Sequence, residues 1–156
     1  MRFLNTLLAV KDIAASKQFY HDILRLEVLS DFGANAVLTG GIALQTLETW
    51  AGFLHKPESE IILKNNAVEL YFEESEIEDF CEQLPKDIQF VHGLREHSWG
   101  QRVVRFYDPD GHIIEVGENM AIVARRFIDS GMTIAETAKR MDVPVDYVEY
   151  LFLAVE

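Results

Sequence analysis

Few residues in this chain have the types and spacing that covalent chemistry requires. The sequence contains no Gly-x-Ser-x-Gly nucleophile motif, no Gly-rich phosphate loop and no evident nucleophile–base pair. Cys81, the only cysteine, falls on the apolar face of a predicted helix, which indicates an inert buried thiol. What remains is a set of amide, carboxylate, guanidinium and aromatic side chains. Their chemistry is ligand binding or, for the carboxylates, metal binding.

One of these carboxylates lies on a strand predicted over residues 67–72. Val68, Leu70 and Phe72 alternate along it and form an apolar row that should pack on helices. The same alternation turns Glu69 and Tyr71 to the opposite face of the sheet. An aromatic ring and a carboxylate are therefore expected side by side on one strand.

Hydrophobic periodicity predicts a β-α-β-β-β unit in the first part of the chain. Asp12 can cap the helix that follows the first strand, and Gly33 and the pair Gly40-Gly41 supply turns. A short helix is expected around residues 49–55. The four predicted strands cover residues 4–10, 27–32, 35–38 and 42–47.

A second unit repeats this order. Ser75 and Glu78 have capping-box spacing at the start of its predicted helix, and Asp108-Pro109-Asp110-Gly111 has the pattern of a type I turn. A helix and a Gly-led strand recur at offsets of about 61 and about 70 residues, which indicates an internal duplication. Chance similarity among short amphipathic segments is the alternative. The predicted strands of this unit cover residues 67–72, 88–91, 102–107 and 112–116.

Residues 119–156 form an extension with three predicted helices. Gly131 ends the first helix, a Thr133–Glu136 capping box opens the second, and Pro144 starts the third. The arrangement resembles a small helix-turn-helix tail, but the last helix carries acidic residues and no Lys or Arg, which argues against DNA binding. The extension should stabilise the domain, cover an open end of a cavity, or contact a second subunit.

Composition narrows the class of partner. The chain of 156 residues has 14 Lys and Arg against 26 Asp and Glu, a net charge of −12, so nucleic acid and anionic membranes are unfavourable partners. A single cysteine fits a reducing compartment, and a cytoplasmic location is expected. The apolar N-terminal run is short, is interrupted by Asn5 and lacks a cleavage pattern. It therefore predicts a buried strand and no signal peptide, and no apolar run approaches the length of a membrane helix.

Two segments carry a resemblance to a known family. The opening Leu7-Leu8-Ala9-Val10-Lys11-Asp12 followed by Phe19-Tyr20, and the run from Arg105 through Asp108-Pro109-Asp110-Gly111 to Glu115, resemble the glyoxalase/bleomycin-resistance/dioxygenase (vicinal oxygen chelate) superfamily. The resemblance covers roughly residues 1–118. It implies an α+β fold of two βαβββ modules paired around a cavity, here with a C-terminal helical extension. The expected boundaries are 1–57, 64–118 and 119–156.

The resemblance also implies four metal-ligand positions, which enzymes of the superfamily fill with His and carboxylate. In this chain they fall on Asn5, on Gln45, near Ala67 and on Glu115. Two amides, a methyl group and one carboxylate do not suit Zn, Fe or Ni. No metal cofactor is therefore expected. A loose divalent-metal site formed by Glu69 and Glu115 is the alternative.

The resemblance further places Gln101 and Arg105 on the cavity side of their strand. Arg105 could pair with Glu115 in a structural role, or could bind an anionic group of a ligand. Trp99 and Trp50 could stack on a planar ligand or could simply pack. The predicted ligand-binding residues are Asn5, Gln45, Trp50, Glu69, Tyr71, Trp99, Gln101, Arg105 and Glu115.

Three functions remain open. The leading hypothesis is a metal-independent protein, often a homodimer in this superfamily, that binds a small organic molecule between its modules. The second is a metal-dependent lyase, isomerase or dioxygenase of the glyoxalase type, so whether the chain is an enzyme stays open. The third is an interaction module that uses the C-terminal helices. Catalytic residues are not identified.

Overall fold

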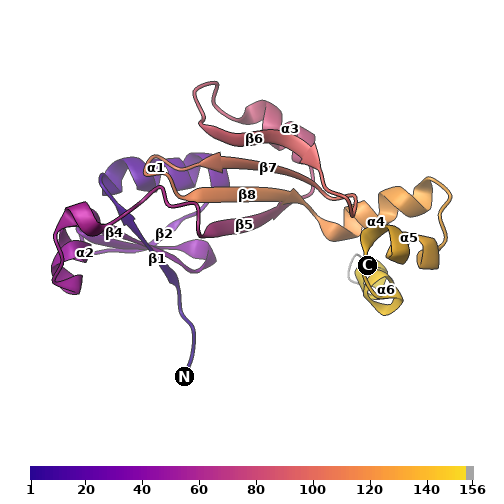
Figure 1. Ribbon diagram of the computed structural model, residues 1–156, viewed down its shortest axis with the longest axis horizontal. Coiled ribbons are helices and arrows are strands. Elements are labelled where there is room, and N and C mark those ends of the chain that lie inside the picture. The colour runs from indigo at the N-terminus through magenta and orange to yellow at the C-terminus, as the bar shows by residue number, and fades with distance from the viewer. Residues whose placement is uncertain (154–156) are drawn as a thin grey trace. The chain divides into compact units, whose positions relative to one another are not determined.

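The computed structural model describes residues 1–153, with side chains through Phe152, and divides into two compact units (Figure 1). The first unit comprises Met1–Glu69 and Tyr107–Ile113, and the second comprises Leu70–Phe106 and Ile114–Glu156. Each unit is built around one four-stranded sheet. The module boundaries expected from the sequence stay a prediction.

The first unit contains the expected β-α-β-β-β order. Its sheet has the strand order β1-β4-β3-β2, with β1 parallel to β4 and the other pairs antiparallel. The elements are β1 (Thr6–Val10), α1 (Ile13–Leu24), β2 (Val28–Asp31), β3 (Asn35–Leu38), β4 (Ile42–Thr46) and α2 (Leu47–Leu54), with short 3₁₀ turns at Thr39–Gly41 and Glu58–Glu60.

Local chemistry fixes the start of α1. The carboxylate of Asp12 accepts hydrogen bonds from the backbone nitrogens of Ala14 and Ala15 at 2.9 and 3.0 Å, which confirms the predicted cap. From this helix Tyr20 points into the unit with its side chain fully buried. Its ring therefore anchors α1 to the core.

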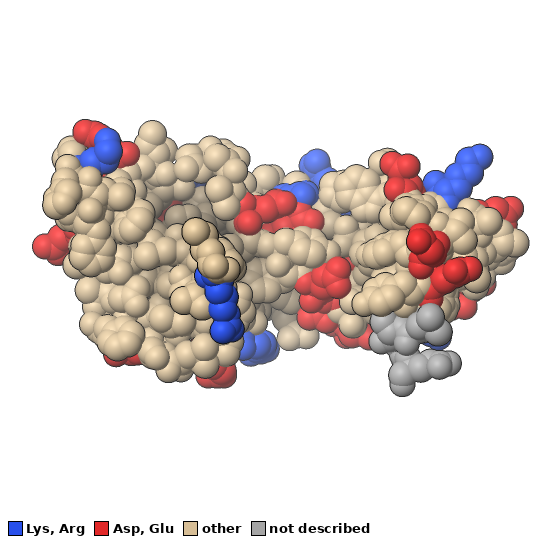
Figure 2. All heavy atoms as spheres, turned by 90° about the horizontal axis from the view of Figure 1, so that it is seen from below, with Lys and Arg blue, Asp and Glu red and all other residues tan. Residues whose placement is uncertain are grey.

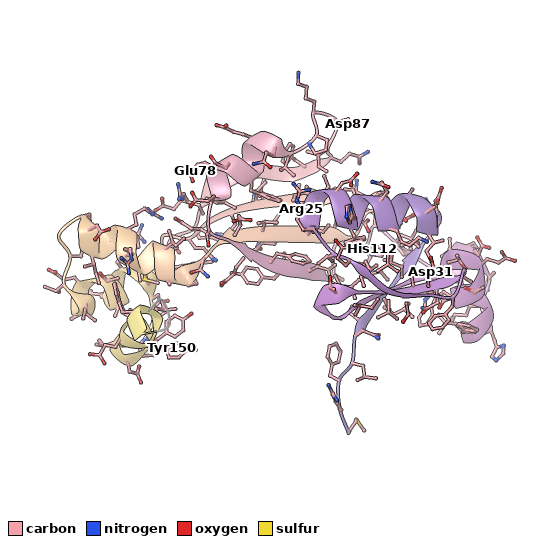
Figure 3. The ribbon with its side chains drawn as sticks, turned by 180° about the vertical axis from the view of Figure 1, so that it is seen from behind. Arg25, Asp31, Glu78, Asp87, His112 and Tyr150 are labelled. Carbon is pink, nitrogen blue, oxygen red and sulfur yellow. The ribbon has the colours of Figure 1, made fainter. Side chains whose placement is uncertain are left out.

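The Asp108–Gly111 turn belongs to this first unit. The Gly111 nitrogen donates to the Asp108 carbonyl at 3.1 Å, which is the hydrogen bond that closes many β-turns. The buried Asp108 carboxylate accepts from the Tyr20 hydroxyl at 2.9 Å, and Asp110 accepts from the Lys11 backbone nitrogen at 3.2 Å. His112, labelled in Figure 3, donates from Nε2 to the Ala9 carbonyl at 2.9 Å. These contacts fasten the turn to the unit.

The second unit repeats the topology, because its sheet has the order β5-β8-β7-β6. Two sheets with matching strand order confirm the predicted α+β fold of two βαβββ modules. The elements of this repeat are β5 (Glu69–Glu74), α3 (Ile77–Gln83), β6 (Phe90–Glu96), β7 (Arg102–Tyr107) and β8 (Ile113–Glu118).

The predicted capping box at the start of α3 is wrong. The N-cap residue is Glu76, without a side-chain cap, and the Glu74 carboxylate accepts from the backbone nitrogens of Ser75 and Glu76 at 2.7 and 3.0 Å. Glu78 pairs instead with Arg102 on β7. A full positive charge outcompetes a neutral backbone N–H for a carboxylate.

The three expected helices of the extension are present as α4 (Met120–Asp129), α5 (Ile134–Met141) and α6 (Val145–Leu153). The Thr133–Glu136 capping box of α5 is confirmed, with both reciprocal hydrogen bonds formed. The helices share a buried cluster of their own. Its members are Val123, Ala124, Phe127, Ala138, Met141, Val148 and Leu151.

Candidate functional site

The nine predicted ligand-binding residues fall into both units. Tyr71, Trp99, Gln101, Arg105 and Glu115 belong to the second unit. The other four, which are Asn5, Gln45, Trp50 and Glu69, belong to the first. Each group is described within its own unit.

In the first unit, Gln45 is buried and its amide is already used. Its oxygen accepts from Asn35 Nδ2 at 3.0 Å, while its nitrogen donates to the Ala34 carbonyl at 3.0 Å and to the Thr49 hydroxyl. These bonds join β3, β4 and the start of α2. Gln45 therefore holds the local structure together, and a ligand would have to compete with three internal partners.

In the second unit, Glu115 on β8 is buried and forms an ion pair with Arg105 on β7. Arg105 also contacts His92 Nε2, at 3.2 Å from its Nη1. A buried carboxylate needs such a partner to offset its desolvation. The positive charge of Arg105 thus compensates the buried negative charge of Glu115 on the neighbouring strand.

The four implied metal positions do not fit a metal. Gln45 is bonded within its own unit, and the charge of Glu115 is compensated by Arg105. A transition metal needs several His, Cys or carboxylate ligands converging on one point. Within residues 1–152, no group of three or more His, Cys, Asp or Glu is placed to supply them.

The second unit contains a pocket of about 650 Å³, large enough for a drug-sized molecule. One wall is formed by Tyr71 and Glu73 of β5 and by Trp99 and Gln101 ahead of β7. The opposite wall comes from the extension. It consists of Met120, Met141, Asp142, Val143, Pro144 and Tyr147.

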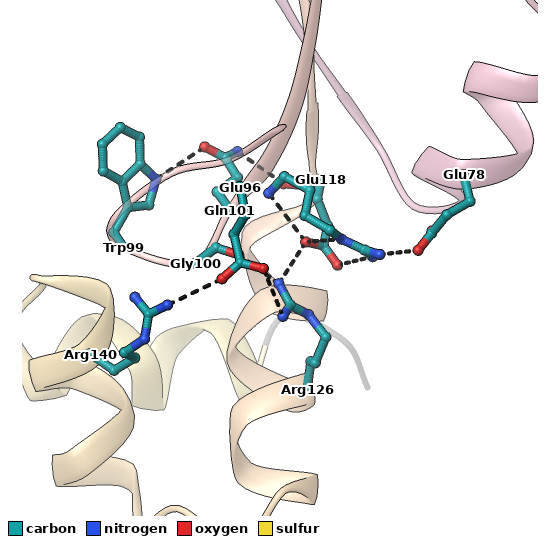
Figure 4. Close-up of polar contacts among 9 residues, drawn as sticks. Glu78, Glu96, Trp99, Gly100, Gln101, Glu118, Arg126 and Arg140 are labelled. Atoms are coloured by element: carbon teal, nitrogen blue, oxygen red, sulfur yellow. Dashed lines mark hydrogen bonds and ion pairs between the residues drawn. The ribbon is translucent and has the colours of Figure 1, made fainter. Parts of the chain in front are cut away.

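Hydrogen bonds link the polar side chains of the sheet wall into one row. Trp99 Nε1 donates to Gln101 Oε1 at 3.3 Å (Figure 4). Gln101 Nε2 donates to the Tyr71 hydroxyl at 2.9 Å. The same Gln101 nitrogen donates to the Glu118 carbonyl at 2.9 Å, and the Tyr71 hydroxyl donates to Glu73 Oε1 at 3.0 Å. The row therefore runs from an indole to a carboxylate with each group oriented by the next.

The Tyr71 hydroxyl stays protonated over the physiological range. The pKa of Tyr71 is raised to about 12, with burial as the largest cause; the hydrogen bond from Gln101 acts in the opposite direction, and the nearby Glu73 carboxylate adds to the rise. The phenol thus acts as a neutral hydrogen-bonding group. It is not a base at neutral pH.

A charged network connects this pocket to the extension. The fully buried Glu118 carboxylate accepts from Arg102 Nη2 at 2.6 Å and from Arg126 Nη2 at 3.1 Å (Figure 4). Arg126 also donates to the Gly100 carbonyl at 2.5 Å, and Arg140 pairs with Glu96 at 3.1 Å. The network therefore fixes α4 and α5 to β6 and β8 and to the turn that carries Trp99 and Gln101.

Sequence reasoning allowed the extension to cover an open end of a cavity, but it identified none of the residues that form the helical wall of the pocket. Met141, Asp142, Val143 and Tyr147 carry no local sequence feature that marks them as ligand contacts. The period-two alternation that selected Tyr71 could have found Glu73, two residues further along the same strand.

The first unit has a smaller pocket, of about 460 Å³, next to α2. Most of its lining residues are polar or charged, such as Lys11, Thr46 and Glu58, and none of them is one of the nine predicted residues. It lacks the aromatic surface that organic ligands use for binding. The pocket of the second unit is therefore the stronger candidate.

Two βαβββ modules with matching strand order define a glyoxalase-type protein. The model of the glyoxalase-like domain family matches residues 3–121, and the chain belongs to that family. A curated relative, the metallothiol transferase FosB of Staphylococcus saprophyticus subsp. saprophyticus, is 29% identical over 110 residues, which span 69% of this chain and 70% of the relative.

Solved structures agree on the fold. A protein of unknown function from Agrobacterium tumefaciens str. C58 has 36% identity and a TM-score of 0.68, over 76% of this chain and 94% of that one. A glyoxalase-related enzyme from Fulvimarina pelagi has 18% identity and a TM-score of 0.66, over 78% and 90%. In the part of the chain that the structure describes, no helix is long and apolar enough to cross a membrane.

Proposed function

We propose that this glyoxalase-family chain binds a small organic molecule in the pocket between its second sheet and the C-terminal helices. The observation that carries the proposal is the pocket of about 650 Å³ in which Tyr71, Trp99 and Gln101 come together. These three residues were selected from the sequence as ligand contacts, and the pocket adds apolar surface from Met120 and Met141. Aromatic faces beside a few oriented polar groups are typical of ligand sites.

We further propose that binding needs no metal. The support is the donor set, since the implied ligand positions supply two amides, a methyl group and one carboxylate that is already paired. The metal-dependent alternative draws on the named activity of the relative at 29% identity. Elemental analysis of the purified protein, with thermal melting after addition of Ni, Zn, Mn or Fe, separates the two. Stoichiometric metal or a raised melting temperature would favour the alternative.

Binding itself can be tested with acridine, a tricyclic probe that suits a pocket of this size. Val143→Trp should fill the pocket and abolish the calorimetric signal. Val145→Trp, on the exposed surface of α6 and outside the lining, is the matched control and should bind as the wild type does. Equal binding by both variants would refute the proposed site, as would failure of the wild type to bind acridine or either of its charged derivatives.

The remaining expectations are also proposals. A homodimer and a cytoplasmic location follow from the resemblance and the single Cys81, and light scattering would test the first. An interaction module formed by the extension is the other alternative. Deletion of residues 119–156 would remove both the interaction module and the helical wall of the pocket, so the comparison of Val143→Trp with Val145→Trp, which fills the pocket and leaves the helices in place, separates the two.

A further inference from the structure

The side-chain hydrogen-bond donors of Trp99, Gln101 and Tyr71, in the polar wall of the pocket, are all engaged within the protein. The Trp99 indole N–H points to Gln101, both hydrogens of the Gln101 amide point to Tyr71 and to the Glu118 carbonyl, and the Tyr71 hydroxyl points to Glu73. What this row still offers to a ligand is acceptor capacity on the amide oxygen and the carboxylate. A ligand that meets it must bring its own donors.

The charges of the lining have one sign. Glu73 and Asp142 are carboxylates, and no Lys, Arg or His occurs among the described residues that line the pocket. Glu73 is bonded to neutral groups, the Tyr71 hydroxyl and Asn119 Nδ2 at 2.8 Å, so its negative charge is not neutralised by these partners. Figure 2 shows acidic side chains together with a smaller number of Lys and Arg on this side of the second unit. The charges of the lining residues themselves favour cations.

The remaining lining suits a flat, polarisable body. Tyr71, Trp99 and Tyr147 supply three aromatic rings, and Met120 and Met141 supply thioethers. Aromatic faces attract cationic nitrogen as well as apolar surface, and methionine adapts to planar rings. The Tyr147 hydroxyl can donate or accept, so it is compatible with either kind of ligand.

We propose that the pocket selects organic cations, in which a flat aromatic body fills the space between the rings and a positively charged nitrogen faces Glu73 and Asp142. This inference rests on the proposed function and specifies its ligand class. It differs from the sequence-based expectation of an anionic group bound by Arg105, because Arg105 is paired with Glu115 and is not part of the lining.

The test uses three acridines that share one ring system and differ in charge at pH 8, namely N-methylacridinium, neutral acridine and acridine-9-carboxylate. Calorimetry should give the cation the highest affinity, about tenfold above neutral acridine if each partly exposed carboxylate contributes about threefold. The carboxylate should bind most weakly. Added NaCl should reduce the affinity of the cation only.

Two conservative substitutions locate the charge effect. Glu73→Gln keeps the shape of the side chain, and Asp142→Asn suits the left-handed backbone of that position, where φ is +57°. The double variant should bind N-methylacridinium about tenfold more weakly and should bind acridine unchanged. Glu82→Gln with Glu149→Gln removes the same net charge outside the pocket and should leave all three affinities unchanged.

The outcomes separate the two proposals. If acridine and its carboxylate bind as tightly as the cation, charge selection is wrong while the binding pocket stands. Charge selection is likewise wrong if the outside double variant loses as much affinity as the pocket variant. If none of the three probes binds the wild type, the pocket itself is refuted and the inference falls with it.

Discussion

Replacing Glu118 with glutamine should destabilise the second unit more than any other single loss of a carboxylate in the charged network. The Glu118 side chain is fully buried at the end of β8, and Arg102 and Arg126 converge on it. Arg102 donates from Nε at 3.0 Å and from Nη2 at 2.6 Å. Glutamine keeps one oxygen acceptor but turns an amide N–H₂ toward a guanidinium group, so both the charge and part of the bonding are lost.

The magnitude follows from burial and from what the arginines retain. Removing one partner of a buried ion pair typically costs about 3–5 kcal/mol. Here the side chains of Arg102 and Arg126 are 23% and 34% exposed, and they keep Glu78 and Glu96 as second partners. We therefore expect a loss at or below the lower end of that range, about 2–3 kcal/mol in the free energy of unfolding, or about 5–10 °C in melting temperature.

Urea unfolding followed by circular dichroism measures this loss, and Glu78→Gln is the matched control. Glu78 contacts the same guanidinium group, but its side chain is 55% exposed, so its removal should cost less than about 1 kcal/mol. Unfolding free energies of the two variants within about 0.5 kcal/mol of each other would show that burial does not set the strength of this network.

Lowering the pH should reduce the free energy of unfolding of the wild type more than that of the Glu118→Gln variant. Burial alone would raise the pKa of Glu118, but hydrogen bonds from its two arginines outweigh burial and hold the pKa below its ordinary value. Its contribution to stability is therefore complete above the ordinary carboxyl pKa range and is lost as the pH falls through the lowered pKa. Urea titrations between about pH 7 and about pH 3 would show the unfolding free energy of the wild type falling more steeply than that of the variant. Tyr20→Phe removes the hydroxyl that donates to buried Asp108 at 2.9 Å and should cost about 1.5–3 kcal/mol in the same assay, whereas wild-type stability would contradict a role for that bond. Gly117→Ala places a methyl group 2.8 Å from Gln101 Nε2 and should weaken N-methylacridinium binding at least about threefold by calorimetry. An unchanged affinity would mean that the Gln101 side chain can shift without affecting the pocket.

Local sequence signals predicted most of the fold because they act over a few residues. Asp12 and the Thr133–Glu136 pair cap their helices through bonds that span two or three positions. The Ser75–Glu78 pair has the same spacing but fails, because Glu78 reaches Arg102, 24 residues away along the chain. The local sequence around Ser75 does not reveal Arg102 as a competing partner, because the two segments meet only in the folded sheet.

The candidate site was predictable only in part for the same reason. Alternation along one strand selected Tyr71 as a cavity residue, and Tyr71 lines the pocket of the second unit, although the cavity expected from the sequence lay between the modules. Gln45 was chosen because the family resemblance places a metal-ligand position there, yet its amide is already hydrogen-bonded to Asn35 on β3, to the Ala34 carbonyl and to Thr49 on α2. The helical side of the pocket depends on how α5 and α6 pack, and residues such as Asp142 and Tyr147 have no local feature that reveals it.

The Asp108–Gly111 turn makes the first unit discontinuous along the gene. Its residues are translated some forty positions after Glu69, yet they supply the acceptors for the Tyr20 hydroxyl and the Lys11 amide. When only the first four strands have left the ribosome, the first unit still lacks the Asp108–Gly111 turn. A recombinant that takes Met1–Glu69 from one relative and the Asp108–Gly111 turn from another would not keep these hydrogen bonds matched. Functional recombinants should therefore inherit both segments from the same parent.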